Sequence, residues 1–248
     1  MKTLIRLYPI FLVCLLWEGL TRTKVVDPMF LPPLSVALVD IYDNAAMLAG
    51  DVLISLGRAF GGLAIGVSVG FVIGTAMARN GAFDRFMDPL LSAVFPTPKL
   101  ALFPLLMAWL GIGETSKITV IAITAFFPVA INTYAGIRGV DRFLIWNAMT
   151  KGATPLQMLF KVMLPAALPF IFAGLRVATS FSFLLVVAAE MLAANSGLGF
   201  RILYSERTFD TETMYAAILL VVALGFLVDR LLGMIGRRLL AWQDTAVH

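Results

Sequence analysis

Long apolar segments alternate with short polar ones along almost the whole chain. About six of these segments have the length and composition of membrane-spanning helices, which need about 20 predominantly apolar residues. We expect them at residues 4–20, 53–78, 89–110, 118–137, 168–189 and 214–235. The pattern therefore predicts an all-α polytopic membrane protein with a single transmembrane domain over residues 1–248.

The first apolar segment has the charged start and apolar middle of a secretory signal. We interpret it as an uncleaved span, because the apolar run reaches Leu20, no small-x-small cleavage site follows, and Trp17 supplies an interfacial aromatic ring. Residues 22–50 contain too many acids and prolines to cross a bilayer. We expect an external loop there, with a surface helix that Ser35 caps.

Four glycines in the second segment recur at every fourth position, which places them on one face of a helix. Glycine lowers helix propensity, so a stripe of this kind in a membrane indicates close approach of another helix. The stripe consists of Gly62, Gly66, Gly70 and Gly74. Static packing and a surface on which helices slide during transport are both compatible with the spacing.

The third segment is interrupted by Phe95-Pro96-Thr97-Pro98-Lys99. Two prolines break the backbone hydrogen bonding of a helix, and the freed groups are tolerated at depth only where protein or a water-lined cavity satisfies them. A charge near the middle of a span also faces the interior or reaches for the interface. Lys99 is therefore a candidate pathway residue, or else an interfacial one.

Three further polar side chains in the later spans are candidate pathway residues. Asn132 either lines a path or hydrogen-bonds a neighbouring helix. Arg176 is expected to have a partner or an aqueous cavity, and an interior arginine suits an anionic solute, although a purely structural pairing fits it equally well. Glu190 lies at the far end of the same span.

The longest polar to amphipathic interruption in the second half of the chain is residues 146–165. Gly152 permits a sharp turn, and Thr154 followed by Pro155 is typical of a helix start. An apolar stripe follows at helical spacing, and Pro165 is expected to end the helix. The stripe consists of Leu156, Leu159, Phe160 and Met163. So short a helix lies on lipid head groups or docks into the groove of a partner.

This stretch resembles the cytoplasmic coupling loop of permease subunits of ATP-binding-cassette (ABC) importers, whose motif is Glu-Ala-Ala, a downstream glycine and Ile-x-Leu-Pro. Matching positions are Ala148, Gly152, Val162, Leu164 and Pro165, whereas Trp146 and Asn147 replace the first two motif residues. The resemblance extends over residues 96–117, 126–141, 164–178 and 188–200, which are similar to the nitrate, sulfonate and taurine branch of that family.

The resemblance implies a type I ABC importer permease fold. It also implies that two permease copies form the pore, that two ATPase subunits dock on the helices of residues 152–165, and that an external solute-binding protein delivers the solute. Ala148, Gly152, Leu164 and Pro165 are carried over as coupling residues from the motif. No cofactor is expected in this chain, because ATP would be bound by the partner subunit.

Composition agrees with a membrane protein, since hydrophobic residues make up 60% of the chain, charged residues 14%, and the mean hydropathy is +0.93. The basic residues are scattered between apolar runs, so they indicate orientation and not nucleic-acid binding. Six spans place most of them on the same side as the 146–165 stretch and both termini, namely Lys2, Arg6, Arg79, Arg85, Arg138, Arg142, Lys151, Lys161, Arg237 and Arg238. That side is predicted to be the cytoplasmic face of a bacterial inner membrane.

The sequence offers little for covalent chemistry. His248 is the single histidine and Cys14 the single cysteine, so neither a metal site nor a disulfide is expected. The 111–117 turn lacks the Gly-Lys-Ser/Thr ending of a nucleotide loop. An ATP-driven permease for a small solute, with Lys99 and Arg176 favouring an anion such as nitrate, taurine or an alkanesulfonate, is therefore predicted over a membrane enzyme. The main alternative is an ion-gradient-driven secondary carrier.

Overall fold

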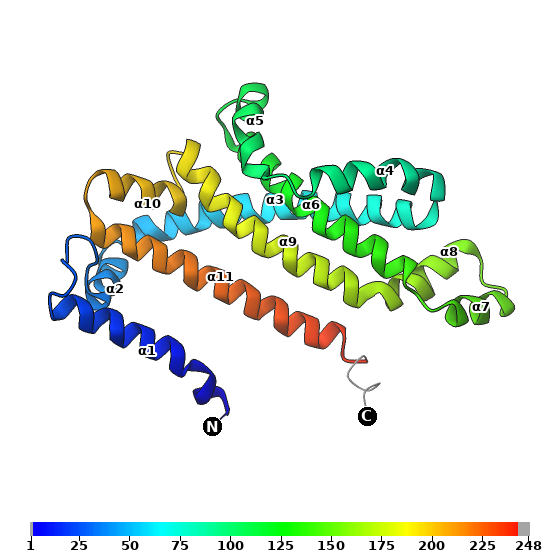
Figure 1. The fold of residues 1–248 in the computed structure, drawn as a ribbon, viewed down its shortest axis with the longest axis horizontal. Helices are drawn as coiled ribbons and strands as arrows, with labels where there is room; N and C mark the ends of the chain where they lie inside the picture. Colours follow the sequence, from blue (N-terminus) through cyan, green and yellow to red (C-terminus); the bar gives the residue numbers. More distant parts are fainter. Residues whose placement is uncertain (1, 243–248) are drawn as a thin grey trace. The chain divides into compact units, whose positions relative to one another are not determined.

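The computed structural model describes residues 2–242, and for residues 2–7 it describes only the course of the backbone. The predicted positions of the Lys2 and Arg6 side chains and of His248 therefore lie outside the described residues. Every element in the described part is helical (Figure 1). The elements are α1 (Lys2–Arg22), α2 (Leu34–Asp43), α3 (Ala45–Arg79), α4 (Gly81–Val94), η1 (Lys99–Leu102), α5 (Phe103–Leu110), α6 (Glu114–Arg138), α7 (Arg142–Thr150), α8 (Pro155–Met158), the π-helical turn η2 (Leu159–Met163), α9 (Leu164–Ala193), α10 (Leu198–Arg207) and α11 (Thr211–Leu239).

Four helical stretches are long and apolar enough to cross a membrane, namely Ala45–Arg79, Glu114–Arg138, Pro155–Ala193 and Thr211–Leu239. Each extends beyond the predicted span at both ends. A fifth crossing is formed if α4 and the Lys99–Leu110 segment, which are bent by 93° relative to each other, count as one broken span. Within the part that the structure describes, α1 is not among the helices that are long and apolar enough to cross a membrane. The count of six spans therefore stays a prediction.

The chain divides into two compact units, and α3, α9 and α11 each run from one into the other. The first unit comprises residues up to 56 together with 190–224. Its core is built around Leu48, Leu198, Ala216 and Ala217. In the same unit, the Trp17 ring meets the Tyr215 ring edge-on and its indole N–H donates to Pro32 O at 2.9 Å. These contacts attach α1 to the following loop and to α11.

The predicted surface helix is α2, but Ser35 does not cap it. The helix begins at Leu34 after Pro33, which has no side chain able to cap. Glu18 of α1 supplies the missing acceptor, because its carboxylate accepts from Ser35 N at 3.1 Å and from Ser35 Oγ at 2.7 Å. The cap therefore comes from another helix, which a search of local sequence does not find.

The second unit comprises residues 57–189 and those from 225 onward. Its central feature is the contact between the glycine stripe of α3 and α6. A Cβ atom added at Gly62 would lie 2.6 Å from Ile121 Cβ, and one added at Gly70 would lie 2.7 Å from Phe126 O. Cβ atoms added at Gly66 and Gly74 would each lie 2.4 Å from a carbonyl oxygen, that of Ala122 and that of Ala130 respectively. The close approach predicted from the glycine spacing is therefore present.

The helix α4 doubles back along the last turns of α3 in this unit (Figure 1). Met77 of α3, Leu91 of α4 and Phe127 and Ala130 of α6 form a buried cluster that holds the three helices together. Asn80 caps α4 through its side-chain oxygen, which accepts from Ala82 N and Phe83 N. The α4 helix ends at Val94, directly before the predicted interruption at residues 95–99.

A single added methyl group at the glycine stripe tests this packing. Gly70→Ala forces α3 away from the Phe126 carbonyl, and overpacking of this kind costs about 1–3 kcal/mol. We expect a lower apparent melting temperature of the purified protein in detergent. Gly57→Ala is the matched control, because nothing lies within 4 Å of its added Cβ and alanine raises helix propensity by about 1 kcal/mol. Equal stability of the two variants would show that the stripe is not closely packed.

Candidate functional site

Lys99 adds hydrogen bonds where α4 breaks, at a carbonyl, Val94 O, that also accepts from Thr97 N at 3.1 Å and from Thr97 Oγ at 2.6 Å. Pro98 has no N–H to donate to the Val94 carbonyl four residues back. The Lys99 ammonium donates to Val94 O at 3.1 Å and also to Phe95 O. It lies 5.2 Å from the Phe95 ring centroid and 4.8 Å from that of Phe127, within the range of cation–π attraction. The predicted helix break and the charged side chain of Lys99 are thus in direct contact, because the lysine binds carbonyl groups at the break.

Asn132 lies in the contact between α6 and α9. Its side-chain amide donates to Pro128 O at 2.8 Å, within its own helix. A Cβ atom added at Gly174 of α9 would lie 2.7 Å from Asn132 Cβ and 2.8 Å from Pro128 O. The geometry therefore gives Asn132 a place in helix packing, with its amide N–H bonded within α6, and the path-lining role stays a prediction.

Arg176 of α9 has the partner that its position requires. Its guanidinium forms two hydrogen bonds with the Asp229 carboxylate of α11, at 2.9 and 3.0 Å. Both side chains remain about half exposed within the described chain. Asp229 was missed by sequence reasoning, although it is an acid within the last apolar segment and such residues are expensive in a membrane.

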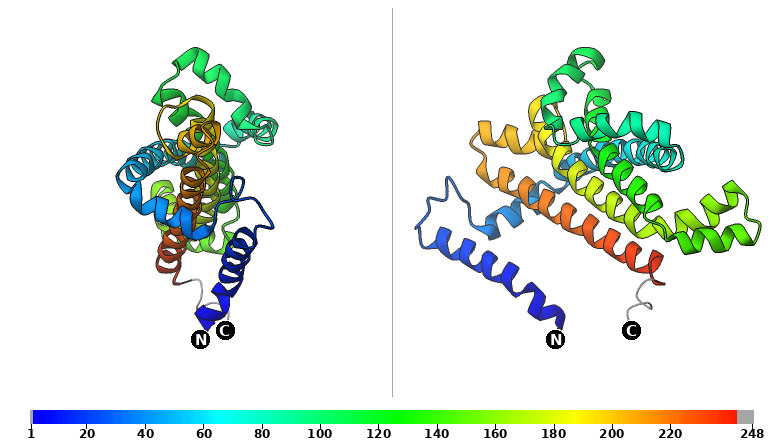
Figure 2. Two further views of the ribbon diagram at one scale, coloured as in Figure 1. Left: turned by 90° about the vertical axis from the view of Figure 1, so that its left-hand side faces the viewer. Right: turned by 45° about the vertical axis from the view of Figure 1, so that its right-hand side comes forward.

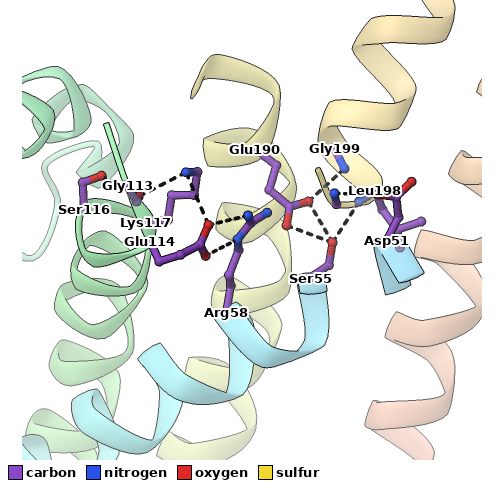
Figure 3. A network of polar contacts seen from close by, with 11 residues as sticks. Asp51, Ser55, Arg58, Gly113, Glu114, Ser116, Lys117, Glu190, Leu198 and Gly199 are labelled. Carbon is purple, nitrogen blue, oxygen red and sulfur yellow. Dashed lines mark hydrogen bonds and ion pairs between the residues drawn. The ribbon is translucent and has the colours of Figure 1, made fainter. Parts of the chain in front are cut away.

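Glu190 is buried in the first unit, where its carboxylate is enclosed by hydrogen-bond donors. Its side chain is 1% exposed, and its carboxylate accepts from Ser55 Oγ at 2.8 and 2.9 Å and from Gly199 N at 2.9 Å (Figure 3). Asp51 accepts from Gly197 N at 2.8 Å, and Ser55 Oγ accepts from Leu198 N at 2.9 Å. Three side chains thus bind three successive N–H groups at the start of α10.

This acidic cap holds the start of the helix α10, which spans Leu198–Arg207 between the last two predicted spans. Gly197 has φ of 103°, a conformation that favours glycine, and the Glu190 carboxylate occupies the place of its absent side chain. Arg201, one turn into α10, pairs with Asp51 at 2.8 Å. Residues brought together from distant segments therefore determine where this helix begins.

A second polar cluster belongs to the other unit. The Arg58 guanidinium, which is almost fully buried, binds both oxygens of Glu114 at 2.6 Å (Figure 3). Lys117 is also buried, and its ammonium donates to Gly113 O at 3.1 Å and lies 3.9 Å from Glu114. This cluster joins the start of α6 to α3. Sequence reasoning missed it because Arg58 and Glu114 are far apart in the chain.

The predicted coupling stretch is a helical hairpin whose two arms are α7 and α8 with η2 (Figure 2). Asp141 caps α7 by accepting from Phe143 N. The turn between the arms contains Gly152 at φ of 76°, a left-handed conformation that costs other residues about 1–2 kcal/mol. Thr154 and Gln157 then form a reciprocal capping box at the start of α8. The local features predicted for the turn and helix start are thus all present.

The predicted four-residue apolar stripe is divided between two environments. Leu156 and Phe160 are exposed at 63% and 62%, whereas Leu159 is buried at 5%. Met163 is partly buried. Leu159 therefore packs within the chain. The other arm of the hairpin also carries exposed apolar side chains, among them Trp146 and Met149 of α7, each 61% exposed. We call Trp146, Met149, Leu156 and Phe160 the hairpin patch.

The prediction that Pro165 ends the helix is wrong. Helical structure continues from Pro155 through the π-helical turn into α9 and reaches Ala193. Leu164 N donates to Leu159 O, five residues back, and such a local widening accommodates a backbone that lacks a donor. Leu164 and Pro165 therefore join the hairpin to a membrane helix. Ala148 is partly buried, and its carbonyl accepts from Ala153 N across the turn.

Known proteins resemble this chain over most of its length. The family model for the inner membrane component of binding-protein-dependent transport systems matches residues 62–241. The aliphatic sulfonates transport permease protein SsuC of Bacillus subtilis is 34% identical over 233 residues, which cover 93% of this chain and 84% of the relative. The taurine transport system permease protein TauC of Escherichia coli is also 34% identical, over 91% of this chain and 85% of its own length.

Solved structures resemble the fold. A chain of an amino acid ABC transporter matches with a TM-score of 0.65 at 18% identity, covering 81% of this chain and 97% of its own. A chain of the inward-facing MetNI methionine ABC transporter matches with a TM-score of 0.62 at 21% identity, covering 79% of this chain and 95% of its own. These structures support the predicted type I importer permease fold.

The chain belongs to the family of inner membrane components of binding-protein-dependent transport systems. It is the permease of an ABC importer, a multi-pass membrane protein, and not an ion-gradient-driven carrier.

Removal of the Glu190 carboxylate tests the acidic cap of α10. Glu190→Ala removes the acceptor of Gly199 N and leaves a cavity beside Gly197, and loss of a cap and its buried hydrogen bonds costs about 1–3 kcal/mol. We expect faster hydrogen–deuterium exchange in residues 198–207. Glu206→Ala, at an exposed position of the same helix, serves as the control and should exchange like the unchanged protein. Unaltered exchange in Glu190→Ala would contradict the role of this carboxylate.

The pair of Arg176 and Asp229 is tested by a double-mutant cycle. Arg176→Met leaves an unpaired carboxylate in the membrane region, and Asp229→Leu leaves an unpaired guanidinium. We expect each single change to lower the apparent melting temperature more than the double change does. Thermal unfolding of the three variants in lipid nanodiscs measures the coupling. Strictly additive losses would mean that the two charges do not stabilise each other.

Proposed function

We propose that this permease carries a small organic anion and couples its transport to ATPase subunits through the hairpin of residues 142–163. Two copies would form the pathway, two ATPase subunits would bind and hydrolyse ATP, and an external solute-binding protein would deliver the solute. The chain itself would bind no cofactor and hold no metal. Relatives that transport aliphatic sulfonates or taurine support the choice of an anionic solute.

The observation that carries the proposal is the hairpin patch. Four large apolar side chains from the two arms of the hairpin are more than half exposed. Exposed aromatic and methionine side chains of this kind are typical of protein interfaces. The arms are fixed by the capping box and by the glycine turn, so the patch presents a defined shape rather than a mobile loop. A preformed surface binds a partner with a smaller entropic penalty.

Charges around the patch support a cytoplasmic position. Arg142, Lys151 and Lys161 are exposed on the same hairpin, while Asp141 is occupied in capping α7. Basic residues accumulate in the cytoplasmic loops of membrane proteins. With the hairpin on that side, an ATPase in the cytoplasm can reach it, and the predicted topology also places both termini there.

The continuous helix from Pro155 to Ala193 supplies the mechanical link. Closure of the ATPase subunits on ATP would displace the hairpin as a rigid body, and the displacement would enter α9 directly through η2. The free energy of the switch would come from the difference in ATPase binding between the two permease states. Gly152 keeps the two arms in register, because its positive φ defines the turn between them.

Charge substitution in the patch tests the coupling. Leu156→Glu and Phe160→Glu each bury an unpaired carboxylate if an ATPase covers the patch, so we expect at least a tenfold loss of ATPase recovered with the tagged permease from its native host. Mass spectrometry of the co-purified proteins gives the measurement. Solute-stimulated ATP hydrolysis should fall in parallel.

A matched control separates loss of docking from the general effect of an added charge. Ile112→Glu introduces the same charge at a position that is 77% exposed outside the hairpin, and it should leave ATPase recovery unchanged. Leu159→Glu is not informative, because that side chain is buried within the chain. If Leu156→Glu and Phe160→Glu retain the ATPase but release the hairpin from lipid, the patch is an interfacial anchor and the coupling proposal is wrong.

A further inference from the structure

The second unit contains a cavity of about 320 Å³ at the break between α4 and α5. Its lining includes Phe95 and Lys99 from the break, Thr124 from α6, and Phe181, Leu184 and Leu185 from α9. A volume of this size is at the lower end of that found for small-molecule sites. The walls are apolar apart from the lysine and the threonine hydroxyl groups, so the cavity suits a ligand that is mostly hydrocarbon.

The cavity lies near the middle of the membrane-spanning helices. Thr124 is about 15 Å along the α6 axis from Glu114 and about 21 Å from Arg138, at 1.5 Å per residue. Phe181 lies about 26 Å from the start of α9 and about 18 Å from its end, by the same rise per residue. A charge at this depth is expensive unless an opposite charge or water compensates it. The ammonium of Lys99 is therefore the dominant electrostatic feature of the cavity.

Lys99 retains the capacity to bind an anion. A lysine ammonium has three donor hydrogens, and two of them engage the carbonyls of Val94 and Phe95. Among the described residues, no carboxylate lies within ion-pair distance of it. The Phe95 and Phe127 rings attract the cation without neutralising it. One N–H and one unit of positive charge thus remain for a ligand.

We propose that this cavity binds the solute as an organic monoanion with an apolar body, such as an alkanesulfonate. The inference deepens the proposed function and rests on it for the direction and energy of transport. The anionic head group of the solute accepts a hydrogen bond from the remaining Lys99 N–H, and its hydrocarbon chain lies against Phe181, Leu184 and Leu185. A single free donor matches one negative charge and not two.

The same walls select against two other kinds of anion. A small inorganic ion such as nitrate leaves most of the cavity unfilled and gains nothing from its apolar lining. Taurine carries an ammonium group at its far end, which the apolar walls cannot solvate and which Lys99 repels. The cavity therefore distinguishes anions by what is attached to the charged group, and it favours a hydrocarbon chain over no chain or a chain that ends in an ammonium.

Equilibrium binding of hexanesulfonate to the purified permease in neutral-lipid nanodiscs tests the site, with empty nanodiscs to subtract partition into lipid. We expect saturable binding that strengthens about fourfold for each methylene from butane- to hexanesulfonate. Lys99→Met should weaken it about 10- to 100-fold, as for loss of a charge-assisted hydrogen bond, and Lys99→Arg should restore most of it. 1-Hexanol, hexyltrimethylammonium and taurine should bind at least tenfold more weakly.

A second variant keeps the test decisive if Lys99→Met disturbs the end of α4. Leu184→Trp fills the cavity from an exposed position and leaves Lys99 in place. It should weaken hexanesulfonate about tenfold and remove the gain per methylene. Leu192→Trp, at an exposed position of α9 that does not line the cavity, is the matched control and should bind like the unchanged protein.

Several results would overturn the inference. These are the absence of saturable hexanesulfonate binding, equal affinity in Lys99→Met and the unchanged protein, equal affinity for 1-hexanol or taurine, and full binding in Leu184→Trp. The assay contains no ATPase, so its failure does not bear on the hairpin. Retention of the ATPase by Phe160→Glu together with intact hexanesulfonate binding would instead refute the coupling role and leave the cavity standing.

Discussion

Within a hydrocarbon environment, each charge and each unpaired backbone group must find its partner inside the protein. The helical interruptions of this permease follow from that requirement. At the end of α4, where prolines interrupt the helix, the Lys99 ammonium donates to the carbonyls of Val94 and Phe95. Where α10 begins, the side chains of Asp51, Ser55 and Glu190 accept from its free N–H groups. At these two places a polar side chain accompanies the irregular backbone.

The same requirement limits what holds the helices together. Burial of apolar surface gives little advantage over lipid, so association depends on close packing and on polar pairs. The glycine stripe of α3 brings its backbone into contact with carbonyl groups of α6, while Arg176 and Asp229 link α9 to α11. Both devices fix the relative position of helices closely. Small displacements of one helix are therefore resisted until a larger rearrangement becomes available.

Features encoded over a few residues could be predicted from the sequence, and those encoded across the chain could not. The glycine stripe, the break before Lys99, and the Gly152 turn with its Thr154 cap all arise from local backbone preferences. The partner of Arg176 is 53 residues away, and Glu190 meets Ser55 across 135 residues, so neither pairing has a local signal. Leu159 has the spacing of an exposed stripe but packs against α7, because burial depends on the neighbouring helix.

The helix continues through Pro165, contrary to the prediction, and this continuity has a mechanical consequence. A helix that ended there would leave a loop between the hairpin and the membrane, and a loop absorbs displacement by changing its own dihedral angles. The π-helical turn instead keeps the backbone hydrogen-bonded from Pro155 into α9. The helix α9 contains Arg176. Its residues Phe181, Leu184 and Leu185 also form one wall of the Lys99 cavity. Under the proposed coupling, a partner that moved the hairpin would move one wall of the cavity, while the ammonium at the α4 break belongs to a different element.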